Sequence, residues 1–267
     1  MNEKIVPNNI YHGDAYELIK QLPDNSVDLI ITDPPYEYVN GGGGGCFGIK
    51  KKGYHKEYLK VSKNHNSINK RKLSSRYEIS HLTTGLDYSI LDDFVRIMKK
   101  INIYIFCTKH MIQDLMNYFI NKDCNFDVLV WCKTNPLPTS NNTYHNDTEY
   151  ILFFRDKGVK VFGDYTTKFK YYLSSINIDD KKNFSHPTIK PLDLVKRYIL
   201  NSSSENDVVL DPFLGSGTTA VAAKELGRRY IGFEIDKDYF KIAKDRLNGI
   251  NANGQTSVFT DFDLIEE

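Results

Sequence analysis

Several features are scarce in this sequence of 267 residues. It has only four cysteines, Cys46, Cys107, Cys124 and Cys132, and they show no CxxC or Cys/His ligand spacing. We therefore expect neither a disulfide framework nor a structural metal site. No apolar run approaches the ~20 residues that cross a bilayer, and the N-terminus lacks a signal-peptide core. These absences predict a cytoplasmic protein that does not enter a membrane.

An excess of charge of either sign is also missing from the chain as a whole, whose formal net charge is +1. That balance hides one basic segment, because residues 46–85 contain ten bases and two acids. Five consecutive glycines, Gly41–Gly45, precede it and predict a flexible hinge. The composition fits a solvated insertion, and it equally fits an arm that binds the phosphates of a nucleic acid.

Apolar residues predict strands that alternate with helices along most of the chain. The run Val27 to Thr32 is apolar apart from Asp28 and Thr32, and it has the length of a strand buried on both faces. Alternation of this kind predicts an α/β fold, in which helices cover both faces of a doubly wound, mostly parallel sheet. Ligands of such folds bind at the carboxyl ends of the strands. The further strands are expected at Ile10–His12, Asn102–Cys107, Asp127–Lys133, Tyr150–Phe154, Val208–Leu210 and Tyr230–Phe233.

The first unusual strand end is Asp33-Pro34-Pro35-Tyr36, directly after the buried run. Two prolines remove backbone donors and leave carbonyl oxygens free to accept hydrogen bonds. With a carboxylate and an aromatic ring beside them, they suit a planar group that bears an exocyclic amine, such as a base extruded from a duplex. The plainer interpretation is a turn that ends a strand and exposes a tyrosine.

The second unusual strand end runs from Asp211 to Ala220 and contains Gly215 and Gly217. The glycines allow a tight turn and close approach of a ligand to the backbone, and a helix N-terminus follows. Glu234 ends the next strand, where a carboxylate accepts hydrogen bonds from ribose hydroxyls. By itself this pattern also fits a dinucleotide-binding dehydrogenase or a glycine turn without a ligand.

Together these residues resemble the amino-group DNA methyltransferases. Asp33-Pro34-Pro35-Tyr36 is similar to their catalytic motif, and the segment from Asp211 to Thr218 is similar to their S-adenosylmethionine motif. The catalytic motif comes first, as in the circularly permuted beta class that methylates adenine N6 or cytosine N4. Further resemblance lies in Tyr11 to Asp14, in Trp131 to Pro136 with the later Glu149, and in His186 to Pro191.

The resemblance implies a Rossmann-like methyltransferase fold and a division of the chain. Residues 1–40, 86–154 and 186–250 would form one catalytic domain, and 251–267 a C-terminal tail. The resemblance does not cover the segments 41–85 and 155–185. Their composition and position predict that 41–85 is a DNA-binding arm and that 155–185 is a target-recognition segment.

The resemblance also implies roles for individual residues. Asp33 and the Pro34 carbonyl would hold the amine of the target base, Tyr36 would stack on that base, and Lys190 would pair with the methionine carboxylate of the cofactor. The implied catalytic residues are Asp33, Pro34, Pro35 and Tyr36. The implied cofactor-binding residues are Asp14, His186, Thr188, Lys190, Asp211, Phe213, Gly215, Gly217, Thr218 and Glu234.

These implications predict a site-specific DNA methyltransferase that transfers a methyl group from S-adenosylmethionine to adenine N6. Asp at the first catalytic position is typical of the adenine enzymes, and cytosine N4 is the alternative target. A NAD-dependent oxidoreductase would leave the Asp33 to Tyr36 turn unexplained, and an inactive nucleic-acid-binding module would not need that turn intact. The expected partner is DNA, and the candidate protein partners are a cognate restriction enzyme and a second copy of the chain.

Overall fold

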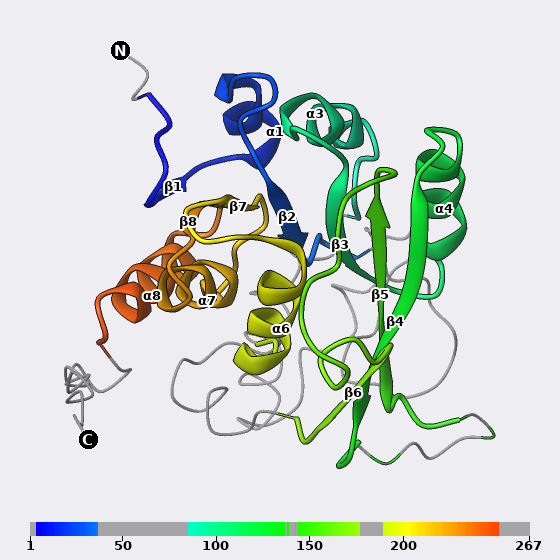
Figure 1. The fold of residues 1–267 in the computed structure, drawn as a ribbon. Coiled ribbons are helices and arrows are strands. Elements are labelled where there is room, and N and C mark those ends of the chain that lie inside the picture. Colours follow the sequence, from blue (N-terminus) through cyan, green and yellow to red (C-terminus); the bar gives the residue numbers. More distant parts are fainter. Residues whose placement is uncertain are drawn as a thin grey trace, which may run out of the picture.

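The computed structural model describes residues 4–36, 85–136, 138, 142, 144–176 and 189–250. In this part of the chain, one sheet of eight strands has the order β1-β8-β7-β2-β3-β5-β4-β6 (Figure 1). The strands are β1 (Asn9–His12), β2 (Leu29–Thr32), β3 (Asn102–Cys107), β4 (Asn125–Lys133), β5 (Thr148–Arg155), β6 (Tyr171–Ser174), β7 (Val208–Asp211) and β8 (Arg229–Glu234).

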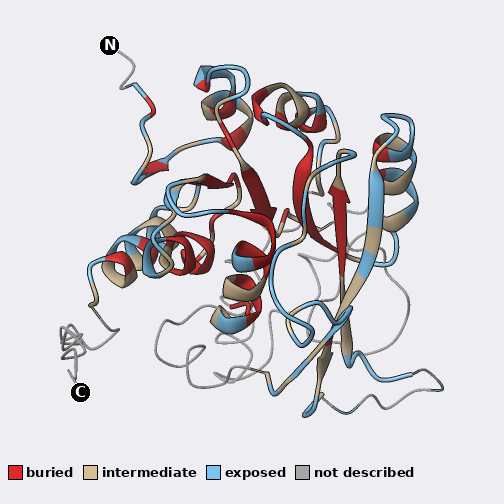
Figure 2. Cartoon of the chain, in the orientation of Figure 1, coloured by how far each residue is buried: buried red, intermediate tan, exposed pale blue. Residues whose placement is uncertain are grey.

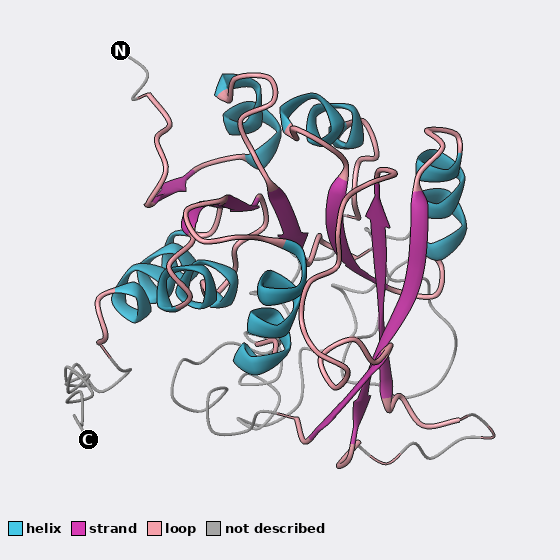
Figure 3. Ribbon diagram, viewed as in Figure 1, coloured by secondary structure: helices cyan, strands magenta, loops and turns pink. Residues whose placement is uncertain are grey.

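Helices follow strands along the chain, and they cover both faces of the sheet (Figure 3). Their bounds are α1 (Ala15–Leu18), the 3-10 helix η1 (Ile19–Gln21), α3 (Ile90–Ile97), α4 (Ile112–Ile120), α6 (Leu192–Ser202), α7 (Thr218–Glu225) and α8 (Lys237–Leu247). None of the helices in the described part of the chain is long and apolar enough to cross a membrane.

The strands β1, β8, β7, β2 and β3 run parallel to one another, and their carboxyl ends meet at one edge of the sheet. This edge is called the site edge below. β5 runs antiparallel to both β3 and β4, so its first residues, rather than its last, lie at the site edge. The register pairs Cys107 at the end of β3 with Tyr150, and Trp131 with Glu149.

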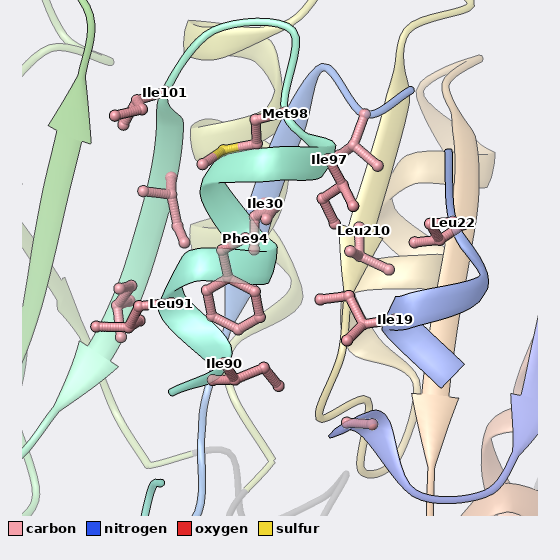
Figure 4. Close-up of a cluster of buried hydrophobic side chains, with 14 of the residues drawn as sticks. Ile19, Leu22, Ile30, Ile90, Leu91, Phe94, Ile97, Met98, Ile101 and Leu210 are labelled. Atoms are coloured by element: carbon pink, nitrogen blue, oxygen red, sulfur yellow. The ribbon is translucent and has the colours of Figure 1, made fainter. Parts of the chain in front are cut away.

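In the described part of the chain, three hydrophobic cores fill the space between the sheet and its helices, and the strands contribute alternately to the two larger ones. Ile30 of β2 packs with η1, α3 and α4, whereas its neighbours Leu29 and Ile31 pack with α6 and α7. Figure 4 shows the first core, in which Phe94 of α3 lies near Ile30. In the second core, the Tyr104 ring stacks between Phe153 and Tyr198. Because β2 is buried on both faces, the turn that follows it starts from a fixed point (Figure 2).

The predicted α/β fold with a mostly parallel sheet is confirmed, and each strand expected from the sequence is present within a few residues. One strand, β6, was not expected; it lies at the edge of the sheet beside β4. The segment 41–85 except Gly85, all of residues 177–188, and the tail 251–267 lie outside the described residues.

Candidate active site

The two unusual turns leave the site edge from neighbouring strands. The turn Asp33 to Tyr36 follows β2, and the glycine turn follows β7, which pairs with β2 through Leu29–Val209 and Ile30–Leu210. Glu234 ends β8, on the other side of β7. The sheet thus brings together three sequence segments that span some two hundred positions of the chain.

Asp33 is the centre of the first turn, because two side chains donate hydrogen bonds to its carboxylate. The Tyr36 hydroxyl donates to Oδ1, and the Lys190 ammonium donates to Oδ2. Lys190 comes from the segment just before α6 and is only 8% exposed. The resemblance predicts that Lys190 pairs with the methionine carboxylate of the cofactor, and in this structure its ammonium group donates to Asp33.

Burial sets the ionisation of this cluster. It raises the pKa of Asp33, although the Lys190 ammonium opposes that shift. It also raises the pKa of Tyr36 well above its ordinary value, so this hydroxyl keeps its proton and donates. Burial disfavours the charge on Lys190, but Asp33 and Glu149 outweigh it and hold the pKa of Lys190 above its ordinary value. The turn therefore holds an acceptor carboxylate between a neutral phenol and a cation.

Glu149, the second residue of β5, extends this cluster. Its Oε2 atom lies 3.3 Å from Lys190 Nζ, and its Oε1 atom lies 2.7 Å from Nζ of Lys133 at the end of β4. Burial disfavours the charge on Glu149, but the two lysines together lower its pKa. Glu149 and Lys133 fell inside a segment that resembles the family, yet nothing in the sequence placed them beside Asp33. Only the antiparallel direction of β5 does so.

The glycine turn has the backbone conformation that its sequence predicts. Gly215 and Gly217 have φ angles of 55° and 86°, and Gly217 is the residue before α7. A side chain at Gly217 would place its Cβ 2.9 Å from Ala243 Cβ, so α8 packs directly on the turn. The Thr218 hydroxyl accepts a hydrogen bond from Arg246 at 3.1 Å.

Asp211 stabilises the start of this turn. Its carboxylate accepts hydrogen bonds from the Thr219 hydroxyl at 2.7 Å and from the Phe213 backbone N–H at 3.1 Å. Burial raises its pKa to about 7, with the Thr219 hydrogen bond opposing the shift. These contacts are all local to the turn, so they account for a structural role of Asp211.

Glu234 connects the end of β8 to the glycine turn. Its Oε2 atom accepts from the Gly215 backbone N–H at 2.7 Å, and its Oε1 atom accepts from the Asp236 N–H at 2.7 Å. A carboxylate oxygen can accept more than one hydrogen bond, so both atoms keep acceptor capacity toward a ligand. The side chain is 6% exposed, and its orientation is fixed before any ligand arrives.

A pocket of about 370 Å³ lies near the N-terminus of α1, and it is lined by Tyr16, Gly85, Leu86 and Asp87. The Tyr16 ring contacts Phe213 of the glycine turn edge-on, with 6.2 Å between the ring centroids. Asp14 caps α1 by accepting from the Tyr16 backbone N–H at 2.9 Å. Sequence reasoning found Asp14 and Phe213 but missed Tyr16, although an aromatic residue two positions after Asp14 was a visible signal.

Two of the expected cofactor residues, His186 and Thr188, lie outside the described residues. The others are placed: Phe213, Gly215, Gly217, Thr218 and Glu234 lie in or beside one turn, Asp14 lies near the adjoining pocket, and Lys190 lies on Asp33. Among the described residues there is no group of three or more His, Cys, Asp or Glu side chains that could hold a metal ion.

A left-handed glycine turn, a buried carboxylate on the next strand and an aromatic-walled pocket fit a cofactor that carries a nucleoside. Beside them, at the end of the neighbouring strand β2, the Asp33 carboxylate is placed to accept hydrogen bonds. This combination defines a Rossmann-like methyltransferase. Comparison with known proteins gives the family: a model described as DNA methylase, of the N6/N4 methyltransferases, matches residues 27–245, and the chain belongs to this family.

Curated relatives cover nearly the whole chain. Type II methyltransferase M2.LlaDCHI of Lactococcus lactis subsp. cremoris is 32% identical, over 90% of this chain and 88% of its own. Type II methyltransferase M2.DpnII of Streptococcus pneumoniae is 30% identical, over 91% and 90%. Among solved structures, the complex of M1.HpyAVI with SAM is 29% identical and has a TM-score of 0.60, covering 90% of this chain and 99% of that one.

Proposed function

We propose that the protein methylates the N6 amine of adenine in DNA, with S-adenosylmethionine as the methyl donor. The observation that carries this proposal is the turn after β2, where Asp33 is held as a hydrogen-bond acceptor one strand away from the glycine turn. Membership of the DNA methylase family and the likeness to the M1.HpyAVI complex with SAM support the reaction and the donor. The choice of adenine rests on Asp at the first position of the motif.

The turn residues act on a target base that has been flipped out of the duplex. An exocyclic amine is a poor nucleophile because its lone pair is delocalised into the ring. Asp33 and the Pro34 carbonyl accept its two hydrogens and favour a more nucleophilic geometry, while Tyr36 stacks on the base. The nitrogen loses one proton when it gains the methyl group, and the Asp33 carboxylate accepts that proton.

When bound, S-adenosylmethionine supplies an activated methyl group on its sulfonium. Glu234 binds the ribose hydroxyls of this donor, and Phe213, Gly215, Gly217 and Thr218 form the turn around it. Asp14 lies on the side of the adenine, together with Tyr16. His186 and Thr188 are proposed for the methionine end, on the resemblance alone. Asp211 orders the turn. Lys190 is proposed for the methionine carboxylate on the resemblance, and its hydrogen bond to Asp33 also connects it with the catalytic turn.

DNA is contacted outside this core. The basic segment 41–85 binds phosphates, which position the duplex without reading its sequence. The segment 155–185 is proposed to read the bases. Its described part exposes the rings of Tyr165, Phe169 and Tyr171, which contact one another in series, and Arg197 of α6 donates hydrogen bonds to the backbone of the same loop.

We place the enzyme in the cytoplasm, where it has access to DNA. A cognate restriction enzyme and a second copy of the chain are its proposed protein partners, the first because the curated relatives are named type II methyltransferases.

The test is transfer of a radiolabelled methyl group from S-adenosylmethionine to DNA, followed by digestion to nucleosides. We expect N6-methyladenine, and N4-methylcytosine would contradict the choice of base. Intact cofactor binding without label in DNA would favour an inactive binding module. The Asp33→Ala variant should lose transfer and keep most of its cofactor affinity, measured by calorimetry. If that variant instead unfolds, Asp33 is a structural residue.

A further inference from the structure

Glu149 is a half-buried carboxylate that the proposed reaction does not use. It stands at the start of β5, the antiparallel strand of the site edge, directly across from Trp131 of β4. Its side chain is 27% exposed, yet its Oε2 atom is shielded from solvent and lies 3.3 Å from Lys190. Placing a charge there is costly unless it is paired. The position therefore points to a specific partner, and that partner is Lys190.

The contacts form an alternating series of charges. Lys133 contacts Glu149, Glu149 contacts Lys190, and Lys190 donates a hydrogen bond to Asp33. Lys190 is therefore shared between two carboxylates, and only one of them belongs to the catalytic turn. We propose that Glu149 is a positioning residue, which shares the positive charge of Lys190 with Asp33 and so leaves the Asp33 carboxylate a stronger acceptor for hydrogen bonds from the target amine.

This inference rests on the proposed function, but its physical content concerns the ligand-free protein. A cation that faces one carboxylate alone stabilises the charged form of that carboxylate more than a cation shared by two, and it makes the carboxylate a weaker acceptor for other donors. Without the charge of Glu149, Lys190 would have only Asp33 as an anionic partner in the described structure. Asp33 would then be a weaker acceptor, and its carboxyl group would lose its proton more easily.

The other groups that face Asp33 do not substitute for Glu149. The Tyr36 hydroxyl is kept neutral by burial, which raises its pKa, and burial likewise raises the pKa of the Cys107 thiol to about 12. Asp211 is a second nearby carboxyl group, and its own pKa is raised to about 7. It has no contact with Lys190 among the described interactions, because its oxygens accept from Thr219 and Phe213. Glu149 is thus the carboxylate that competes with Asp33 for the cation.

The first experiment needs no substrate. In protein labelled with ¹³C at the aspartate carboxyl carbons, NMR follows the titration of Asp33, whose signal is assigned by its loss in Asp33→Asn. We expect Glu149→Gln to move this titration to lower pH. The matched control is Glu225→Gln, since Glu225 has the same 27% side-chain exposure and one lysine partner, Lys196, at 2.5 Å on α6. An Asp33 titration equal to that of the wild type in Glu149→Gln would overturn the proposal.

The second experiment measures methyl transfer, and the wild type decides first whether the proposed function holds. Given an active wild type, Glu149→Gln should lower kcat about 10- to 100-fold, as expected when a reacting group is misplaced. The KM for the cofactor should change little, and the acid limb of the kcat profile should move to lower pH. Glu225→Gln should match the wild type. A proportional fall in activity and folded fraction, with an unshifted pH profile, would overturn the proposal.

A shorter carboxylate keeps the test decisive if Glu149→Gln does not fold. Glu149→Asp retains the charge but withdraws it from Lys190 by one methylene group. Its kcat and its Asp33 titration should lie between those of the wild type and those of an uncharged site. A Glu149→Asp protein that folds and shows wild-type values of both would overturn the proposal, because the distance from Glu149 to Lys190 would then have no effect on Asp33.

Discussion

Lys190 and Asp33 lie 157 positions apart in the chain, and the ammonium group of the first donates a hydrogen bond to the carboxylate of the second. Lys190 is nearly buried, so it is a fixed part of the turn after β2 rather than a surface cation. The segment before α6 therefore belongs to this turn as much as Tyr36 does. The contact joins two distant segments of the chain at the point where the chemistry is proposed.

Replacement of Lys190 by methionine should remove the cation while it keeps most of the side-chain volume. Asp33 then lacks a cationic partner, whereas Glu149 keeps Lys133. Loss of one partner of a buried pair costs about 3–5 kcal/mol. The free energy of unfolding, from denaturant titration, should fall by that order. In any folded Lys190→Met protein the pKa of Asp33 should rise, so the acid limb of activity should move to higher pH.

The exposed pair Lys157–Asp123, with 2.6 Å between Nζ and Oδ2, provides the control for this change. Lys157→Met should leave both stability and the pH profile near those of the wild type, because an exposed pair gains little. Equal losses in the two variants would mean that the burial of Lys190 has no energetic consequence.

A methyl group at Gly217 should destabilise the protein. The residue has a φ of 86°, a conformation that costs other residues about 1–2 kcal/mol, and the new Cβ would lie 2.9 Å from Ala243 of α8. Gly217→Ala should therefore lower the free energy of unfolding by more than the backbone strain alone, and it should weaken cofactor binding.

Gly158 isolates the backbone contribution. Its φ is 89°, and a Cβ there would meet nothing within 4 Å. In denaturant titrations, Gly158→Ala should show the strain without the clash. If both alanine variants lose the same stability, α8 is not pressed against the glycine turn as the structure has it.

Asp211 should make stability depend on pH. Its pKa is raised to about 7 in the folded protein, above its value of 3.8 in an unfolded chain. The folded state therefore binds more protons between these values, and stability falls as pH rises through this window, by at most about 1.4 kcal/mol per pH unit. Asp211→Asn removes this contribution. Thermal denaturation from pH 4 to 8 should show that the variant gains stability relative to the wild type as pH rises, and a constant difference would contradict the assignment.

The basic segment should dominate the salt dependence of DNA binding. Each phosphate contact adds about 0.9 to the slope of log affinity against log salt concentration. Changing Lys50, Lys51 and Lys52 together to glutamine should thus reduce the slope by up to about 3, measured by fluorescence anisotropy. The control is the triple change to glutamine at the exposed lysines of α8, Lys237, Lys241 and Lys244. Equal effects of the two triple variants would remove the special role of residues 41–85.

Much of the fold could be predicted from the sequence because its strands are buried on both faces. The run that became β2 had to be apolar throughout, and this left a signal that does not depend on distant residues. β6 left no such signal. It has four residues at the edge of the sheet, its side chains alternate between exposed and half-buried, and it exists because β4 pairs with it.

Some features of the site could also be predicted from the sequence, and others could not. The glycine turn and its carboxylate Glu234 are encoded locally, by φ angles that favour glycine and by a strand end that follows at a fixed distance. The partners of Asp33 are not encoded locally. The sequence predicts Lys190 at a cofactor carboxylate and gives Glu149 no place in the site. The contacts of Lys190 with Asp33 and with Glu149 depend on the direction of β5 and on the path of the chain before α6.

The pairing of β2 with β7 also has a mechanical consequence. One turn is proposed to hold the acceptor base, and the other is proposed to hold the methyl donor. They follow adjacent strands, and adjacent strands in a sheet lie about 4.8 Å apart. The backbone hydrogen bonds between β2 and β7 thus fix the separation of the two turns, and no domain has to close to bring them together. Because backbone hydrogen bonds set this separation, it does not depend on the side chains at the surface. The loops that recognise the DNA sequence can therefore change while the distance for methyl transfer stays the same.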